Sequence, residues 1–225
     1  PSVFPNNDNV EIDAFYQPHH EVGGDYYDVI QLSDEEILFC MADVSGKGVS
    51  AALLMSNLQA SLRVLAHTTS SLFELVNIIN HKILESANKE KYITMFLAKY
   101  NFSSRRLNYI NAGHIPPLLY EHGKVKELNS GTTILGMFDK LPFVKEGNIS
   151  INKNSVLLCY TDGVEETENE SGEAFGISRV KNILIRHSGD KIQSLLNAVM
   201  NNIESFKIKE QPYSDDITLM GIRFK

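Results

Sequence analysis

The chain has 225 residues, of which 43% are hydrophobic and 22% are charged, as is ordinary for a globular protein with a sizeable core. Its formal net charge of −7, with no local cluster of Lys and Arg, argues against a nucleic-acid scaffold. We find no cleavable leader and no apolar segment near the about 20 residues that a membrane span needs, so we expect a cytoplasmic protein without membrane contact.

The first half of the chain predicts strands joined by tight turns, followed by two helices. Residues 1–9 are polar and rich in turn formers, so we expect a loose leader there. Alternating or apolar runs predict strands, and apolar residues spaced by three and four predict helices. The expected strands are 10–16, 26–32 and 37–42, and the expected helices are 50–67 and 71–85.

The second half adds more strands and a second pair of helices. Expected strands are 94–101, 106–112, 118–120, 125–128, 156–161 and 217–224, and expected helices are 178–187 and 191–205. Residues 131–147 are predicted to be irregular, and a turn at Asp162-Gly163 is expected before a polar loop at 165–172. Tight turns imply antiparallel sheets, and paired helices imply outer layers. We find no linker, so we expect one α+β domain over residues 1–225.

Aspartates stand at the ends of four predicted strands. Asp43 follows an apolar run, Asp162 ends another, Asp25 follows a glycine pair, and Asp215 precedes the last strand. A carboxylate in such a place needs a proton, a hydrogen-bond network or a metal ion, although a single aspartate is also a common turn or helix cap. If these strand ends converge, they form an all-oxygen site, which suits Mg²⁺ or Mn²⁺ better than zinc.

Other signals for chemistry are weaker. The Gly46-Lys47 pair is not a phosphate-binding loop, because Gly48 stands where that loop needs Ser or Thr. The histidines show no zinc-ligand grouping, and the two cysteines lie in apolar runs, where buried reduced thiols are expected. His114 follows an Asn-Ala-Gly turn and has two interpretations, a general acid or a turn histidine satisfied by the backbone.

Five short motifs follow one another along the chain. They are Gly23-Gly24-Asp25-Tyr26-Tyr27-Asp28, Asp43-Val44-Ser45-Gly46-Lys47-Gly48-Val49 with Ala51-Ala52-Leu53-Leu54-Met55, Asn111-Ala112-Gly113-His114 with Pro116-Pro117, Thr161-Asp162-Gly163-Val164-Glu165-Glu166, and Asp215-Asp216-Ile217-Thr218. This order resembles the SpoIIE/RsbU-type serine phosphatases, the bacterial branch of the metal-dependent (PPM) protein phosphatases. The resemblance covers residues 10–224 and implies an αββα sandwich, in which two antiparallel sheets pack face to face with helices outside.

The resemblance also implies a site for two Mg²⁺ or Mn²⁺ ions. Asp43 resembles the carboxylate that bridges both ions, and the Val44 carbonyl resembles the backbone ligand that follows it. Asp25 resembles a ligand of the outer ion, and Asp162 and Asp215 resemble ligands of the inner one. Asp43 and Asp162 are the expected catalytic residues, acting through a water bridged by the two ions.

Further residues are candidates around that site. Asp28 and Asp216 are expected to support the metal ligands from behind or to act as alternate ligands, and His114 is expected to support them. His114 stands where many relatives outside this branch have an aspartate. We find no counterpart of the arginine with which those relatives grip phosphate, because the candidates Arg63, Arg105 and Arg106 lie outside the motifs.

The resemblance implies a phosphoprotein phosphatase of a partner-switching pathway. Its expected substrate is the phosphoserine form of a STAS-type anti-sigma-factor antagonist. The chain opens at Pro1, so we expect a fragment of a longer protein in which an upstream sensory domain acts through helices 50–67 and 71–85. A homodimer is a candidate assembly.

Two alternatives stay open. The first is a catalytically silent interaction domain that keeps the fold, against which the complete set of four aspartates argues. The second is a diguanylate cyclase, whose Gly-Gly-Asp-Glu-Phe turn resembles residues 23–27 except that Tyr26 takes the acidic position.

Overall fold

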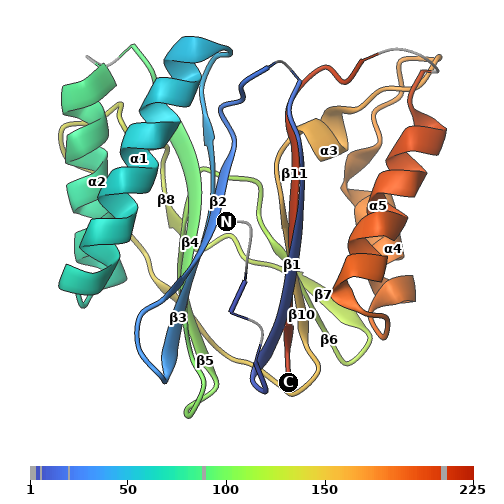
Figure 1. Ribbon diagram of the computed structural model, residues 1–225, viewed down its shortest axis with the longest axis horizontal. Helices are drawn as coiled ribbons and strands as arrows, with labels where there is room; N and C mark the ends of the chain where they lie inside the picture. Colours follow the sequence, from blue (N-terminus) through green and yellow to red (C-terminus); the bar gives the residue numbers. More distant parts are fainter. Residues whose placement is uncertain (1–3, 6, 20, 88–89, 209–211) are drawn as a thin grey trace. The chain divides into compact units, whose positions relative to one another are not determined.

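The computed structural model describes residues 4–5, 7–19, 21–87, 90–208 and 212–225 (Figure 1). Residues 1–3 and 6 of the predicted leader lie outside that description. The described chain divides into two compact units. Unit 1 contains Val22–Pro116 and Leu128–Ile151, and unit 2 contains Phe4–Glu21, Pro117–Glu127 and Asn152–Lys225.

Unit 1 is built on a mostly antiparallel sheet with strand order β2-β3-β4-β5-β8, in which β9 also pairs with β5. Tight connections join β2 to β3 and β4 to β5, as the sequence predicted, and only the short β8 runs parallel to its neighbour. The strands are β2 (Tyr26–Gln31), β3 (Glu36–Val44), β4 (Ile93–Asn101), β5 (Arg106–Ala112), β8 (Gly131–Thr132) and β9 (Gly147–Ser150).

Two helices, α1 (Val49–Thr68) and α2 (Leu72–Ala87), cover one face of the unit 1 sheet (Figure 1). Their apolar stripes, which include Leu58 and Ile79, join the strand residues in one core. By length and composition α1 is long and apolar enough to cross a membrane, which corrects the expectation that no segment approaches that length. Its residues Ala51, Leu54, Leu58, Leu62 and Ala66 are buried in the unit 1 core.

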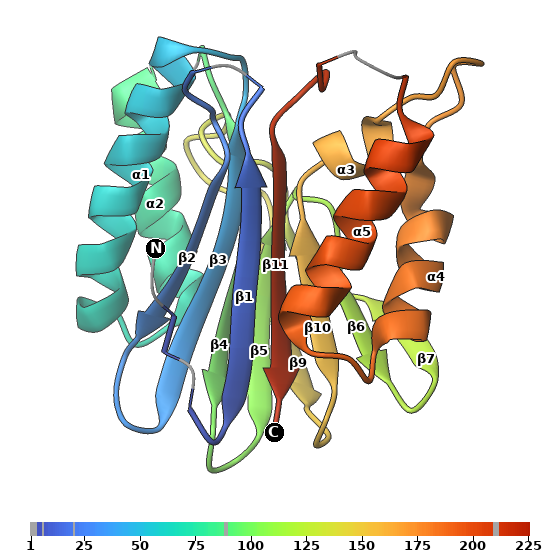
Figure 2. The ribbon, with the colours of Figure 1, turned by 45° about the vertical axis from the view of Figure 1, so that its right-hand side comes forward.

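Unit 2 is built on a second antiparallel sheet with strand order β1-β11-β10-β6-β7. Its strands are β1 (Val10–Gln17), β6 (Leu118–Glu121), β7 (Lys124–Glu127), β10 (Val156–Tyr160) and β11 (Ile217–Phe224). Its helices are α3 (Gly163–Glu166), α4 (Gly176–His187) and α5 (Ile192–Phe206). Figure 2 shows α4 and α5 over this sheet, and α5 comes so close that a Cβ on Gly221 would lie 2.6 Å from the Ile192 side chain.

The α+β class, with two mostly antiparallel sheets and helices, is confirmed, and every predicted helix and strand is present within about three residues of its expected bounds. Three local predictions are wrong. Residues Gly131–Thr132 form the short strand β8 at the start of the stretch that was predicted to be irregular. Residues Gly163–Glu166 form the short helix α3 where a turn and the start of a polar loop were expected. The stretch Gly147–Ser150 is the strand β9, which was missed because four residues with one apolar side chain give no periodic signal.

Candidate metal centre

The two predicted ligands of unit 1 lie at neighbouring strand ends. Tyr26 pairs with Ala42 between β2 and β3, so Asp25, one residue before β2, continues that register opposite Asp43. Residues directly opposite each other in a sheet project to the same face. For Asp25 and Asp43 this is the face turned away from α1 and α2, because the alternate residues of β3 pack in the helix-covered core.

The peptide that carries the predicted backbone ligand is held in place. The Ser45 N–H donates to the Tyr92 carbonyl oxygen at 2.9 Å, and the Lys91 Nζ donates to the Ser45 carbonyl oxygen at 3.0 Å. Since a trans peptide directs its N–H and C=O oppositely, the Ser45 contact fixes where the Val44 carbonyl points. Gly24 lies close by, and a Cβ there would stand 3.0 Å from the Val44 oxygen.

His114 is linked to the same face through Thr94. Thr94 pairs directly with Asp43 across β3 and β4, and its Oγ1 lies 3.0 Å from the His114 Nδ1. The His114 N–H donates to the Asn111 Oδ1 at 2.8 Å. Backbone and ring contacts therefore hold a buried histidine just after the end of β5, with Thr94 of β4 between it and Asp43. Sequence analysis missed Thr94, because its place depends on a register across about 50 residues of chain.

Asp28 lies on the other face of the sheet from Asp25, since the two are three residues apart along β2. Its fully buried carboxylate accepts hydrogen bonds from the Arg63 guanidinium at 2.7 and 3.0 Å and from the Tyr26 hydroxyl at 2.5 Å. Burial would raise the pKa of Asp28, but these hydrogen bonds outweigh it and hold the pKa below its usual value. Asp28 therefore binds α1 through Arg63, and its expected support of the metal ligands stays a prediction.

In unit 2 the ends of β10 and β11 bring Asp162 beside Asp216. The Thr161 N–H donates to the Thr218 carbonyl at 3.1 Å, and the Thr218 N–H donates to the Thr161 Oγ1 at 3.0 Å. A Cβ on Gly163 would clash with the Asp216 carbonyl oxygen, so α3 begins in direct contact with that backbone. Asp162 occupies the N-cap position of α3 but makes no side-chain capping hydrogen bond, so capping does not explain its carboxylate.

Asp215 and Asp216, the acidic pair before β11, make different contacts. The buried Asp216 accepts the His19 N–H on its Oδ1 at 2.7 Å and so anchors the connection after β1. Asp215 is partly exposed, and its Oδ1 accepts the Asp216 N–H at 2.9 Å. This placement fits Asp215 as a ligand and Asp216 as a residue that supports it.

The chemistry of the donors fits a hard cation. Asp25 and Asp43 belong to unit 1, and Asp162 and Asp215 belong to unit 2, and all offer oxygen, the donor that Mg²⁺ and Mn²⁺ prefer. Within the described part of the chain, no group of three or more His, Cys, Asp or Glu side chains is gathered closely enough to hold a metal ion. The convergence of all four aspartates therefore stays a prediction.

Solved structures define the class of fold. The RsbU and RsbW domains of a Mycobacterium tuberculosis protein match with a TM-score of 0.82 at 24% identity, over 96% of this chain and 60% of that one. The PP2C domain of SiaA from Pseudomonas aeruginosa gives 0.80 at 20% identity, over 95% and 86%. RsbX in complex with magnesium gives 0.73 at 16% identity, over 98% of both chains. The fold is that of the PP2C/PPM phosphatase domains.

Sequence comparison then gives the family. The model of stage II sporulation protein E (SpoIIE) matches residues 33–225, so the chain belongs to the SpoIIE family. It is 26% identical over 223 residues to phosphoserine phosphatase RsbU of Bacillus subtilis, which covers 98% of this chain and 65% of RsbU. It is 30% identical over 163 residues to phosphoserine phosphatase RsbP of the same organism, over 70% and 40%. The chain thus spans less than two thirds of these curated relatives.

Proposed function

We propose that residues 1–225 are one metal-dependent phosphatase domain that hydrolyses phosphoserine or phosphothreonine in proteins. The observation that carries this proposal is the register of β2 and β3, which sets Asp25 opposite Asp43 on the sheet face away from the helices. Two carboxylates on one face repel each other unless a proton or a cation is shared. The family match and the phosphoserine phosphatases among the relatives support the same activity.

The residues divide the work of such a site. Asp25, Asp43 and the Val44 carbonyl would hold ions from unit 1, and Asp162 and Asp215 would hold them from unit 2. When bound, two Mg²⁺ or Mn²⁺ ions lower the pKa of water and offset charge on phosphoryl oxygens. Asp43 and Asp162 are the proposed catalytic residues because they would hold the ions that supply this chemistry.

The substrate and the setting are part of the proposal. RsbU and RsbP are phosphoserine phosphatases by name, which supports a phosphoserine protein as substrate, here a STAS-type anti-sigma-factor antagonist in a partner-switching pathway. The proposal includes control by an upstream sensory domain. It also places the protein in the cytoplasm and takes it to be a homodimer. The chain covers only 65%, 39% and 40% of three curated relatives, which leaves room in those proteins for further domains.

The test is hydrolysis of p-nitrophenyl phosphate with and without Mn²⁺. We expect Mn²⁺-dependent turnover that Asp43→Ala and Asp162→Ala abolish. If the protein binds Mn²⁺ but does not hydrolyse p-nitrophenyl phosphate, the result would instead support the catalytically silent interaction domain. Consumption of GTP would indicate the cyclase, an alternative to which the SpoIIE family match gives no support.

A further inference from the structure

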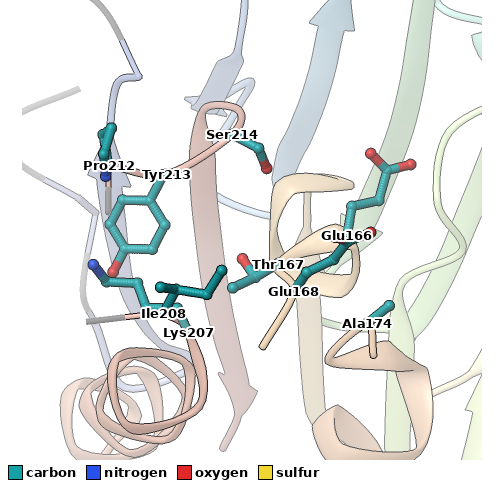
Figure 3. Close-up of a pocket in the computed structure, with 9 residues that line it drawn as sticks. All are labelled: Glu166, Thr167, Glu168, Ala174, Lys207, Ile208, Pro212, Tyr213 and Ser214. Carbon is teal, nitrogen blue, oxygen red and sulfur yellow. The ribbon is translucent and has the colours of Figure 1, made fainter. Parts of the chain in front are cut away.

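A pocket of about 420 Å³ lies in unit 2 (Figure 3). One wall is the end of α3 with the loop after it, and the other wall is formed by residues 207–208 and 212–214, which lie between α5 and β11 in the sequence. The first wall contains Glu166, Thr167, Glu168 and Ala174, and the second contains Lys207, Ile208, Pro212, Tyr213 and Ser214. The volume lies in the range of pockets that bind small molecules or a few side chains.

Each wall of the pocket lies close, along the chain, to one predicted metal ligand. The Glu166 N–H donates to the Asp162 carbonyl at 2.9 Å, which places the first wall one helical turn, about 5.4 Å, beyond Asp162. On the second wall, Ser214 is the residue before Asp215. An extended peptide advances about 3.3 Å per residue. A side chain two to four positions from a phosphoserine held at Asp162 and Asp215 therefore reaches this pocket.

Both walls are held by contacts of their own. The buried Thr167 hydroxyl donates to the Gly163 carbonyl at 2.7 Å, and the Phe175 N–H donates to the Thr167 carbonyl at 2.8 Å. On the other wall, the Lys207 ammonium lies 5.0 Å from the centre of the Tyr213 ring. A pocket whose walls are fixed before binding costs less ordering when a ligand enters.

The charge of the pocket selects its occupant. Glu166 and Glu168 are exposed on the first wall, whereas the Lys207 side chain is only 15% exposed and lies 3.5 Å from the Glu204 carboxylate. The charged side chains that line the pocket, Glu166, Glu168 and Lys207, sum to a negative charge, which disfavours a phosphate group and favours a cation. The Tyr213 ring also lines the pocket, and the Lys207 ammonium already lies over it, which shows that this ring accepts a basic side chain.

We propose that this pocket, lined by Glu168 and Tyr213, binds a Lys or Arg two to four residues from the phosphoserine of the protein substrate. The inference rests on the proposed function and adds a rule of substrate selection to it. Glu168 is the specificity residue, because its side chain is an exposed carboxylate whose backbone is held by a bridge to Ala174.

The test uses phosphoserine peptides that carry either Lys or Glu at each position from −4 to −2 and from +2 to +4, with phosphate release measured in Mn²⁺. We expect kcat/KM to be about threefold higher for Lys at one or more of these positions, as for an exposed ion pair. Glu168→Lys should invert that preference and leave p-nitrophenyl phosphate hydrolysis unchanged. The matched control is Glu170→Lys, the same charge change two residues further along the loop at a residue that does not line the pocket.

The outcomes separate the two proposals. If p-nitrophenyl phosphate is hydrolysed but the peptides show no preference for Lys, or if Glu168→Lys and Glu170→Lys behave alike, the pocket inference is overturned alone. If neither p-nitrophenyl phosphate nor any peptide is hydrolysed with Mn²⁺, the proposed function is overturned, and the inference with it.

Discussion

The unit 1 sheet has aspartates on both faces, and their surroundings differ between the two faces. On the helix-covered face, Asp28 is fully buried and its charge is balanced by Arg63 and a hydroxyl. On the other face, the strand register sets two carboxylates, Asp25 and Asp43, opposite each other. A buried charge with protein donors needs no ion, whereas two like charges side by side favour a cation or a proton. The comparison predicts which aspartates serve catalysis and which serve the fold.

The largest effect should come from the pair of like charges. Asp43→Ala removes the carboxylate shared by both predicted ions, and we expect Mn²⁺-dependent hydrolysis to fall by about 10³-fold or more. Steady-state rates with p-nitrophenyl phosphate measure it. Asp34→Ala, an exposed aspartate between β2 and β3, is the control and should keep full activity. Equal rates for both variants would remove Asp43 from the site.

Removing the partner of the buried Asp28 carboxylate should instead lower the stability of the fold. Arg63→Ala leaves the buried Asp28 carboxylate without its guanidinium, a loss of about 3–5 kcal/mol for a fully buried pair. Because the Arg63 side chain is 51% exposed, we discount this to about 2 kcal/mol. Urea unfolding measures the change, with Arg106→Ala, whose guanidinium contacts the exposed Asn148, as the control. Arg63→Lys should lose less, and a stability equal to wild type in Arg63→Ala would contradict the comparison.

The same contact predicts a pH dependence. The pKa of Asp28 is lower in the folded protein than its ordinary value near 4. A lowered pKa stabilises the fold fully above that ordinary value, and the contribution disappears as the pH falls through the folded pKa. Burial raises the pKa of Asp28 once the Arg63 guanidinium is removed. The difference in unfolding free energy between wild type and Arg63→Ala should therefore be largest near neutral pH and shrink as the pH falls towards the lowered pKa of Asp28 in the folded wild type. A difference that stays constant to pH 2 would show that Asp28 is not the partner.

The smallest effect concerns the backbone ligand. Gly24→Ala adds a Cβ that would stand 3.0 Å from the Val44 carbonyl oxygen, so the carbonyl must shift by a few tenths of an ångström. We expect Mn²⁺ affinity, measured by calorimetric titration, to fall by roughly tenfold, the lower end of the range for mutations of residues that support metal ligands. Gly189→Ala is the control, because a Cβ there meets nothing within 4 Å. Unchanged affinity in Gly24→Ala would argue against Val44 as a ligand.

The sequence predicted the elements well because their signals are local. The hairpin of β2 and β3 follows from two apolar runs around a short turn, and that hairpin already brings Asp25 near Asp43. The partner of Asp28 could not be predicted, because Arg63 lies 35 residues away on a helix and one arginine on a helix gives no directional signal. The face of Asp28 was readable in principle, since residues three apart on a strand point oppositely.

Contacts between segments far apart in the sequence could not be predicted for the same reason. The place of Thr94 beside Asp43 depends on how β4 returns to β3 after two helices, and no pattern in the sequence sets that register. The pocket beside α3 depends on how the segment after α5 approaches a loop about 40 residues earlier. Such pairings are decided by packing of the whole unit.

The most direct test of the account is a crystal grown with Mn²⁺ and examined for anomalous scattering. The account predicts two peaks, with carboxylate oxygens of Asp25 and Asp43 and of Asp162 and Asp215 at ligand distance. Peaks bound elsewhere, or these four side chains on separate faces of the protein, would contradict it.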